Sequence, residues 1–172
     1  MITDSQEELL TQVDQNNKVI GGIERGKAHA SKEICYRTIF VLVINEKNEV
    51  LLQKRSPTKD LYPNCWDLSV GGHVAYGDSY EVTALRELDE ELGIKADMNE
   101  LIDKGKVLVT LPSSNEFFEV FEYSLKKTDS INFAAEEVAE IRWLSLDKIK
   151  ESMKNMTLSW YARPIQIINA LY

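Results

Sequence analysis

The pattern of apolar and polar residues divides the chain into segments that indicate strands. The strongest is 37–45, a run rich in Ile, Val and Leu that predicts a strand buried on both faces. The turn-prone Gln15-Asn16-Asn17 separates 9–14 from 18–24, which predicts an N-terminal hairpin. Further strands are expected at 50–54, 66–70, 101–111, 116–125 and 138–144.

A helical period replaces the strand pattern between residues 80 and 92. Apolar side chains recur there at three- and four-residue steps, which predicts a helix with these positions toward the core: Val82, Leu85, Leu88 and Leu92. Asp78 or Ser79 can cap its start, and Gly93 can end it. Two more helices are expected, at 145–154 and 160–171. Strands with one helix among them and helices at the end predict an α+β protein. We expect a mixed sheet between helices, an α/β/α sandwich, in one domain over 1–172.

Charge and composition restrict the function classes. The formal net charge of −8 and the pI of about 4.9 argue against a surface that coats nucleic acid. The two cysteines, Cys35 and Cys65, form no close pair, as expected in a reducing cytoplasm. The first residues lack the features of a signal peptide, and no apolar run approaches the roughly 20 residues of a membrane helix. We therefore expect a cytoplasmic protein with no membrane or nucleic-acid partner.

Three carboxylates give the strongest chemical signal. Glu87, Glu90 and Glu91 stand at positions i, i+3 and i+4, so on a helix they share one face. Like charges on one face destabilise a helix unless a cation neutralises them. Mg²⁺ takes oxygen ligands and leaves room for substrate phosphates. Arg86 precedes Glu90 by four residues and can orient that carboxylate. The triplet alone leaves a second interpretation open, a solvated acidic helix with one Arg–Glu pair.

The segment 72–94 resembles the Nudix box, Gly-x5-Glu-x7-Arg-Glu-U-x-Glu-Glu-x-Gly-U, where U is aliphatic. The positions that match in register are Gly72, Arg86, Glu87, Leu88, Glu90, Glu91, Gly93 and Ile94. Asp78 stands where the pattern has Glu, so the carboxylate is kept on a shorter side chain.

This resemblance implies a hydrolase that uses Mg²⁺, or Mn²⁺ in its place. Glu87, Glu90 and Glu91 resemble the family's metal ligands, and Arg86 resembles their orienting partner. The Gly71–Gly72 turn resembles the loop whose backbone carbonyl reaches the metal, which we assign to Gly72.

A longer resemblance begins at Val13 and points to one Nudix branch, that of isopentenyl-diphosphate isomerases and isomerase-like hydrolases. The segments 13–21, 27–29, 51–67 and 69–73 carry it. In the isomerases a catalytic cysteine precedes Gly-His, whereas here Gly71 occupies that position. Isomerisation is therefore not expected.

The isomerases also hold a metal with three histidines and two glutamates. In this chain some of these positions keep the matching residue (His29, His73 and Glu116) and others do not (Ser114, and Tyr36 or Cys35). The second metal site is thus expected to be incomplete. A structural role is favoured for His29, and His73 is open between a phosphate contact and a structural role.

Hydrolysis needs a general base, and the sequence leaves several carboxylates as candidates: Glu90, Glu116, Glu136 and Glu137. We place Glu116 with Arg86, Glu87, Glu90 and Glu91 in the expected catalytic set. Contacts to the substrate are expected from Arg55, Lys59, His73 and Trp66. Ordinary loop basicity and core packing are the competing interpretations for these side chains.

These expectations favour a hydrolase that cleaves the pyrophosphate bond of a small nucleoside diphosphate-linked substrate. One alternative is an enzyme of prenyl diphosphates, either an isomerase or a hydrolase. Another is a non-catalytic Nudix-fold binding module, supported by Asp78 alone. The N-terminal extension, 1–26, could serve as a contact in a homodimer.

Overall fold

The fold is organised around one long strand, β3 (Cys35–Ile44). In the computed structural model, which describes residues 5–172, β3 pairs in parallel with β8 (Asn115–Ser124) along its whole length. On its other edge β3 pairs antiparallel with β1 (Leu9–Val13) near its start and with β6 (Val70–His73) further along. β3 is therefore an interior strand, which explains its uninterrupted apolar run.

The remaining strands extend the sheet on both sides of β3. β7 (Leu101–Thr110) lies antiparallel beside β8. β4 (Glu49–Arg55) begins next to the end of β3, with β9 (Val138–Ser145) on one edge and β5 (Trp66–Leu68) on the other. The described chain thus forms a nine-stranded mixed sheet.

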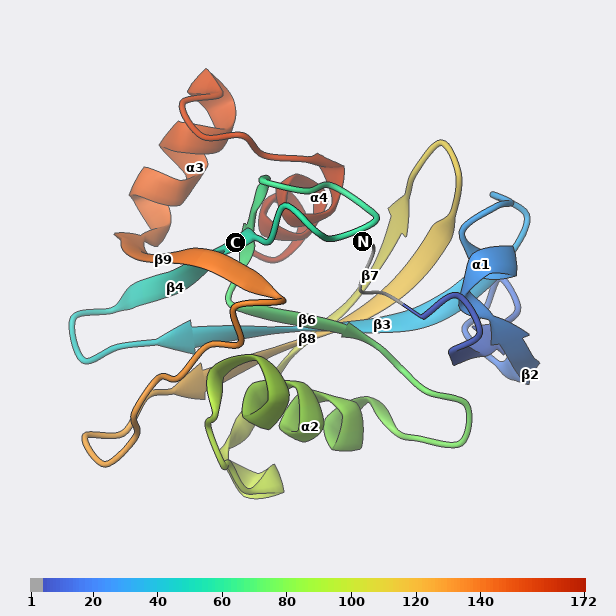
Figure 1. Ribbon diagram of the computed structural model, residues 1–172, viewed down its shortest axis with the longest axis horizontal. Helices are drawn as coiled ribbons and strands as arrows, with labels where there is room; N and C mark the ends of the chain where they lie inside the picture. Colours follow the sequence, from blue (N-terminus) through green and yellow to red (C-terminus); the bar gives the residue numbers. More distant parts are fainter. Residues whose placement is uncertain (1–4) are drawn as a thin grey trace.

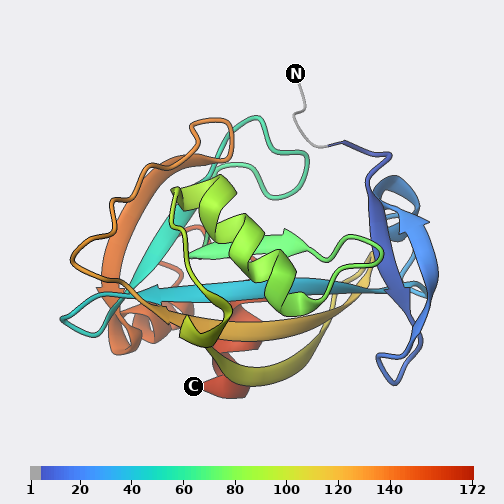
Figure 2. The ribbon, with the colours of Figure 1, turned by 90° about the horizontal axis from the view of Figure 1, so that it is seen from below.

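Helices cover both faces of this sheet. α2 (Tyr80–Leu92) lies on one face, and α3 (Leu146–Asn155) and α4 (Ala162–Leu171) lie on the other (Figures 1 and 2). Alternate residues of β3 pack into the two resulting cores, Val41 on the α2 side and Leu42 on the other. This arrangement confirms the predicted α+β sandwich.

The predicted N-terminal hairpin is present as β1 and β2 (Val19–Glu24), which pair antiparallel. It continues into a short helix, α1 (Arg25–Ala28), that the sequence pattern did not predict. A 3₁₀ turn at Met98–Glu100 was also not predicted. Both are too short to show a period. Residues 1–4 of the expected extension lie outside the described residues.

The predicted core face of α2 was partly wrong. Leu88 and Leu92 are buried as expected, but Val82 is 45% exposed. The core face runs through Tyr80, Ala84 and Leu88 at four-residue steps. Position 82 is two residues from both 80 and 84, so it lies on the opposite side of the helix.

The expected turn at Gly71–Gly72 is instead part of β6, where these glycines pair with Phe40 and Ile39 of β3. The predicted strand 66–70 is interrupted at Ser69. Its hydroxyl donates to the carbonyl of Leu51 and accepts from the N–H of Val43. Within this strand Gly72 faces α2 and Gly71 faces Phe40 on the other side of the sheet.

Candidate active site

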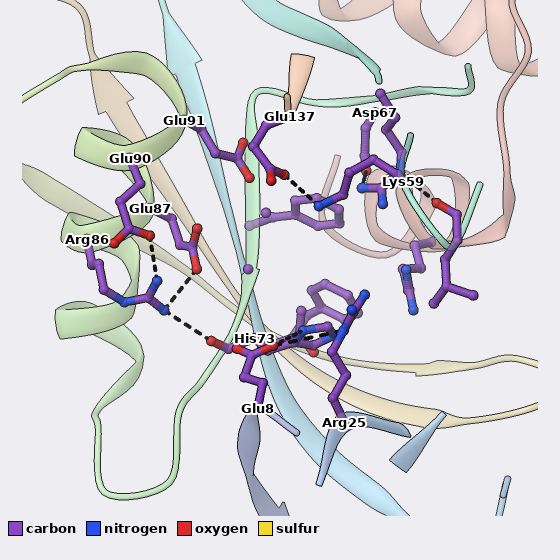
Figure 3. A pocket seen from close by; sticks show the side chains of 18 of the residues that line it. Glu8, Arg25, Lys59, Asp67, His73, Arg86, Glu87, Glu90, Glu91 and Glu137 are labelled. Carbon is purple, nitrogen blue, oxygen red and sulfur yellow. Dashed lines mark hydrogen bonds and ion pairs between the residues drawn. The ribbon is translucent and has the colours of Figure 1, made fainter. Parts of the chain in front are cut away.

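A cavity of about 270 Å³ opens between α2, β6 and the loops before β5 and β9 (Figure 3). One group of lining residues is acidic: Glu8, Asp67, Glu87, Glu90, Glu91 and Glu137. A second group is basic: Arg25, Arg55, Lys59, Arg86 and Arg163. Apolar and aromatic side chains complete the wall, among them Phe40, Leu61, Phe118 and Tyr161. A site of this composition suits a ligand with both charged and apolar parts.

The two ends of α2 fix the position of its carboxylates. Ser79, rather than Asp78, is the N-cap, and its Oγ accepts from the N–H of Val82. Gly93 ends the helix in the left-handed region, at φ 69°. The N–H of Ile94 donates to the carbonyl of Leu88, which completes the C-terminal cap. With both ends fixed, Glu87, Glu90 and Glu91 all line the cavity.

Arg86 neutralises two of these carboxylates. Its guanidinium lies 2.9 Å from Glu87 and 2.8 Å from Glu90, and it also donates to the carbonyl of His73. The predicted i,i+4 pair with Glu90 is therefore present. Arg86 links α2 to β6 at the edge of the cavity (Figure 3).

Gly72 on β6 is the point where the strand comes closest to this group. A Cβ atom at position 72 would lie 2.2 Å from Oε1 of Glu87. Only glycine leaves room for the Glu87 carboxylate beside the backbone of β6. This close approach explains why the residue at position 72 is a glycine.

Two of the three carboxylates are buried and repel each other. Burial is the main cause that raises the pKa of Glu87 to about 7; Arg86 opposes it, and the charges of Glu90 and Glu8 add to it. Burial also raises the pKa of Glu91 well above its ordinary value, with a further contribution from Glu87. A hydrogen bond from Gln53, at 2.8 Å, acts in the opposite direction. A cation bound between Glu87 and Glu91 would offset the repulsion between their charges.

The donor chemistry fits a hard divalent cation, since the wall presents carboxylate oxygens and a closely packed glycine. Within residues 5–172, however, no three His, Cys, Asp or Glu side chains are already arranged to hold a metal ion. Arg86 contacts one oxygen of each of two carboxylates, Oε1 of Glu87 and Oε2 of Glu90. A cation would bind through the second oxygen of these carboxylates or draw them away from Arg86.

The basic side is built from paired side chains at the end of β4 and on the loop that follows it. Lys59 lies 2.6 Å from Glu137, which joins this loop to the segment before β9. Arg55 lies 3.6 Å from the buried Asp67 and donates to the carbonyl of Leu61. Tyr161 also hydrogen-bonds to Asp67. Arg55 and Lys59 thus both line the cavity, and their contact with a substrate stays a prediction.

His73 lines the cavity at the end of β6. Its Nε2 is 3.2 Å from Nε2 of His29, and its Nδ1 is 3.7 Å from Glu8. Burial lowers the pKa of His29 to about 4, and the nearby His73 contributes to this shift. The two histidines are therefore neighbours, as the isomerase resemblance implied.

The catalytic role expected for Glu116 is corrected by the structure. Glu116 is fully buried and is not among the residues that line the cavity. Its Oε1 accepts from Tyr36, Ser114 and Arg163, with Arg163 at 2.6 Å. Glu116 therefore serves as the internal partner of Arg163. Sequence alone did not show that a carboxylate at the start of a strand points into the core.

The substrate contact expected from Trp66 is also corrected. Trp66 is 4% exposed and packs in the core between the sheet and α3 and α4. The guanidinium of Arg142 lies over its ring at 4.6 Å. Its neighbour Asp67 points toward the cavity instead, because successive strand residues face opposite sides.

Sequence reasoning missed several residues of the cavity wall: Glu8, Arg25, Tyr161 and Arg163. Glu8 and Arg25 flank the hairpin and meet the site only in three dimensions. Arg163 did carry a signal, because it is the one charged residue of the terminal helix α4. Of the other base candidates, Glu90 and Glu137 line the cavity and Glu136 does not.

Comparison with known families agrees with this geometry. The family model described as NUDIX domain matches residues 36–164. The chain belongs to the Nudix family. Within the part of the chain that the structure describes, no helix is long and apolar enough to cross a membrane.

Individual relatives cover most of the chain. An uncharacterized Nudix hydrolase from Pseudomonas aeruginosa is 30% identical over 152 residues, which is 88% of this chain and 87% of that protein. A prenyl-diphosphate phosphatase from Methanosarcina mazei is 29% identical over 148 residues, 85% of this chain and 84% of that protein. Other relatives are named isopentenyl-diphosphate isomerase. The crystal structure of DR0079 from Deinococcus radiodurans superposes with a TM-score of 0.77 at 25% identity, covering 96% of this chain and 99% of that one.

Proposed function

We propose that this Nudix hydrolase uses Mg²⁺ to cleave the pyrophosphate bond of a nucleoside diphosphate-linked substrate. The observation that carries this proposal is the meeting of Glu87, Glu90 and Glu91 with Gly72 at one wall of the cavity. The buried, mutually repelling carboxylates call for a cation, and a diphosphate is the ligand that such a cation binds.

The chain's own residues supply the remaining parts of the site. Glu87, Glu90 and Glu91 would hold the ion, and a bound Mg²⁺ would neutralise developing charge and lower the pKa of a coordinated water. Arg55 and Lys59 face the acidic side and would meet the diphosphate oxygens.

Two carboxylates remain as candidates for the general base. Glu90 and Glu137 line the cavity, so either can reach a water next to the diphosphate. Glu137 is paired with Lys59 at 2.6 Å. A substrate phosphate that draws Lys59 away would leave Glu137 free to accept a proton.

A second candidate is a hydrolase of prenyl diphosphates. The apolar side chains of Phe40, Leu61 and Phe118 in the wall suit a hydrocarbon group, and one relative is named prenyl-diphosphate phosphatase. Isomerisation is disfavoured, because Gly71 occupies the position of the isomerase cysteine. No cysteine is found among the described residues of the cavity wall.

The proposal is tested with a panel of diphosphates and phosphorus NMR. Purified protein is incubated with Mg²⁺ and nucleoside di- and triphosphates, nucleotide sugars, dinucleotide polyphosphates and isopentenyl diphosphate. We expect cleavage of one nucleotide class, and the products identify the bond that is broken. Cleavage of isopentenyl diphosphate alone would favour the second candidate.

Variants of the carboxylates test the assignment of the metal site. Glu90→Gln and Glu91→Gln are each expected to abolish turnover while the circular dichroism spectrum is unchanged. Glu81→Gln is the matched control, because Glu81 lies on the same helix away from the cavity and should retain activity. Full activity in both Glu90→Gln and Glu91→Gln would contradict the assignment.

A further inference from the structure

Two buried polar atoms at the cavity have no partner. Thr38 on β3 and Arg163 on α4 both line the cavity, and they are only 6% and 8% exposed. Within residues 5–172, Oγ1 of Thr38 and Nε of Arg163 find no hydrogen-bond partner. A buried polar group without a partner is destabilising, so such groups in a cavity wall point to a ligand that completes them.

Arg163 is held as a fixed hydrogen-bond donor. Its Nη2 donates to Oε1 of Glu116 at 2.6 Å, and the same oxygen accepts from Tyr36 and Ser114. The charge of Arg163 is therefore already balanced inside the protein. Its Nε–H can serve a neutral acceptor as well as a charged one, and the Glu116 network fixes where that acceptor must lie.

The start of α4 favours an acceptor at the same end of the cavity. The ten-residue helix begins at Ala162, and its N-cap, Tyr161, makes no capping hydrogen bond through its side chain. The Tyr161 hydroxyl bonds to Asp67 instead. A helix start carries a partial positive charge, which adds to the donors of Thr38 and Arg163, although its third residue, Pro164, has no N–H to offer.

One part of the cavity wall is aromatic. The rings of Phe40 and Phe118 stack at 5.0 Å with 14° between their planes. Phe40 lies against β6, since a Cβ at Gly71 would be 2.5 Å from its ring. The next residue, Gly72, touches Glu87. Thr38 and Phe40 share the face of β3 toward α4, whereas the carboxylates come from α2 on the opposite face of the sheet.

We propose that Thr38 and Arg163 form a subsite for a hydrogen-bond acceptor on the part of the substrate away from its diphosphate, such as a carbonyl oxygen of a nucleobase. This inference rests on the proposed function and deepens it. It selects a nucleoside diphosphate over a prenyl diphosphate, because a hydrocarbon chain would leave both Thr38 and Arg163 unpaired.

The test uses one substitution that should weaken ligand binding without lowering the thermal stability of the protein. Thr38→Val removes the unpartnered hydroxyl, so thermal stability should stay the same or rise. Affinities for uridine diphosphate and isopentenyl diphosphate are measured by calorimetry on the full chain, with Ca²⁺ in place of Mg²⁺ to separate binding from turnover. We expect roughly tenfold weaker binding of uridine diphosphate, the loss of about one hydrogen bond, and unchanged binding of isopentenyl diphosphate.

Two further variants complete the design. Thr11→Val is the matched control, because Thr11 is also buried but donates to the carbonyl of Ala75 away from the cavity. It should lower thermal stability and leave both affinities unchanged. Arg163→Lys keeps a positive charge beside Glu116 but removes the Nε–H. It should weaken the binding of uridine diphosphate more than the binding of isopentenyl diphosphate.

Several outcomes would overturn the subsite. One is unchanged affinity for uridine diphosphate in Thr38→Val, and another is an equal loss of affinity for both diphosphates. A third is a wild-type protein that prefers isopentenyl diphosphate or binds neither. Binding as expected without hydrolysis of any diphosphate would contradict the proposed function alone.

Discussion

At the scale of single residues, the absence of a side chain at position 72 shapes the acidic wall. A Cβ there would lie 2.2 Å from Oε1 of Glu87, so Gly72→Ala must displace that carboxylate. A shift of about 1 Å at a catalytic group can cost on the order of 100-fold in rate. We expect a loss of that size in kcat/KM for Gly72→Ala, measured on the substrate that the diphosphate panel identifies. Gly21→Ala is the control, because a Cβ at position 21 meets nothing within 4 Å. Activity of Gly72→Ala within threefold of wild type would show that Glu87 is not held against β6.

At the scale of secondary-structure elements, one buried ion pair joins α4 to β8. Burial raises the pKa of Glu116, but the charge and hydrogen bond of Arg163 bring it below its ordinary value. Removing one partner would leave the other charge buried and alone. Arg163→Ala should therefore lower the free energy of unfolding by about 3–5 kcal/mol, measured by urea denaturation. The double variant Arg163→Met with Glu116→Gln should recover part of this loss, because no unpaired charge remains. A cost below about 1 kcal/mol for the single variant would contradict a structural role for the pair.

At the scale of the whole molecule, the carboxylates of α2 make stability depend on pH and on metal. The folded-state pKa of Glu87, about 7, lies above its ordinary value of 4.5. The folded state therefore binds more protons between these values, and the stability that protonated Glu87 gives is lost as the pH rises through 7. Without metal, the melting temperature of the wild type should fall relative to Glu87→Gln between pH 5 and pH 8. His29 acts in the opposite direction below pH 6.5, but it is present in both proteins and cancels in the comparison.

Added Mg²⁺ should reverse this trend at pH 8, because a ligand that binds only the folded state stabilises it. Differential scanning calorimetry in EDTA and in Mg²⁺ measures both effects. Equal metal-induced shifts in the wild type and Glu87→Gln would place the cation elsewhere.

The sequence predicted most of the strands and the helix at 80–92, because long runs of regular period fix the element type. It predicted the meeting of Gly72 with Glu87 only through family resemblance. The sequence could not show which way Glu116 and Trp66 point, since both sides of their strands are buried and the pattern of alternation is lost. Nor could it bring Glu8, Arg25 and Arg163 to the cavity, because their positions depend on pairing between distant segments. The carboxylates of α2 and the basic residues Arg55 and Lys59 were thus predictable, whereas Glu8, Arg25 and Arg163 were not.

The parallel pairing of β3 with β8 also has a consequence for the order of folding. Cys35 lies opposite Asn115, and the segment that joins the two strands contains β4, β5, β6, α2 and β7. During synthesis at about 5–20 residues per second, β3 leaves the ribosome several seconds before its partner. Until β8 is synthesised, the apolar segment Val41-Leu42-Val43 has no strand to pair with on that edge. Pairing between segments so far apart in the sequence also makes folding slow. We expect nascent chains that end before β8 to be captured by chaperones, and the acidic wall to form only after that strand has docked.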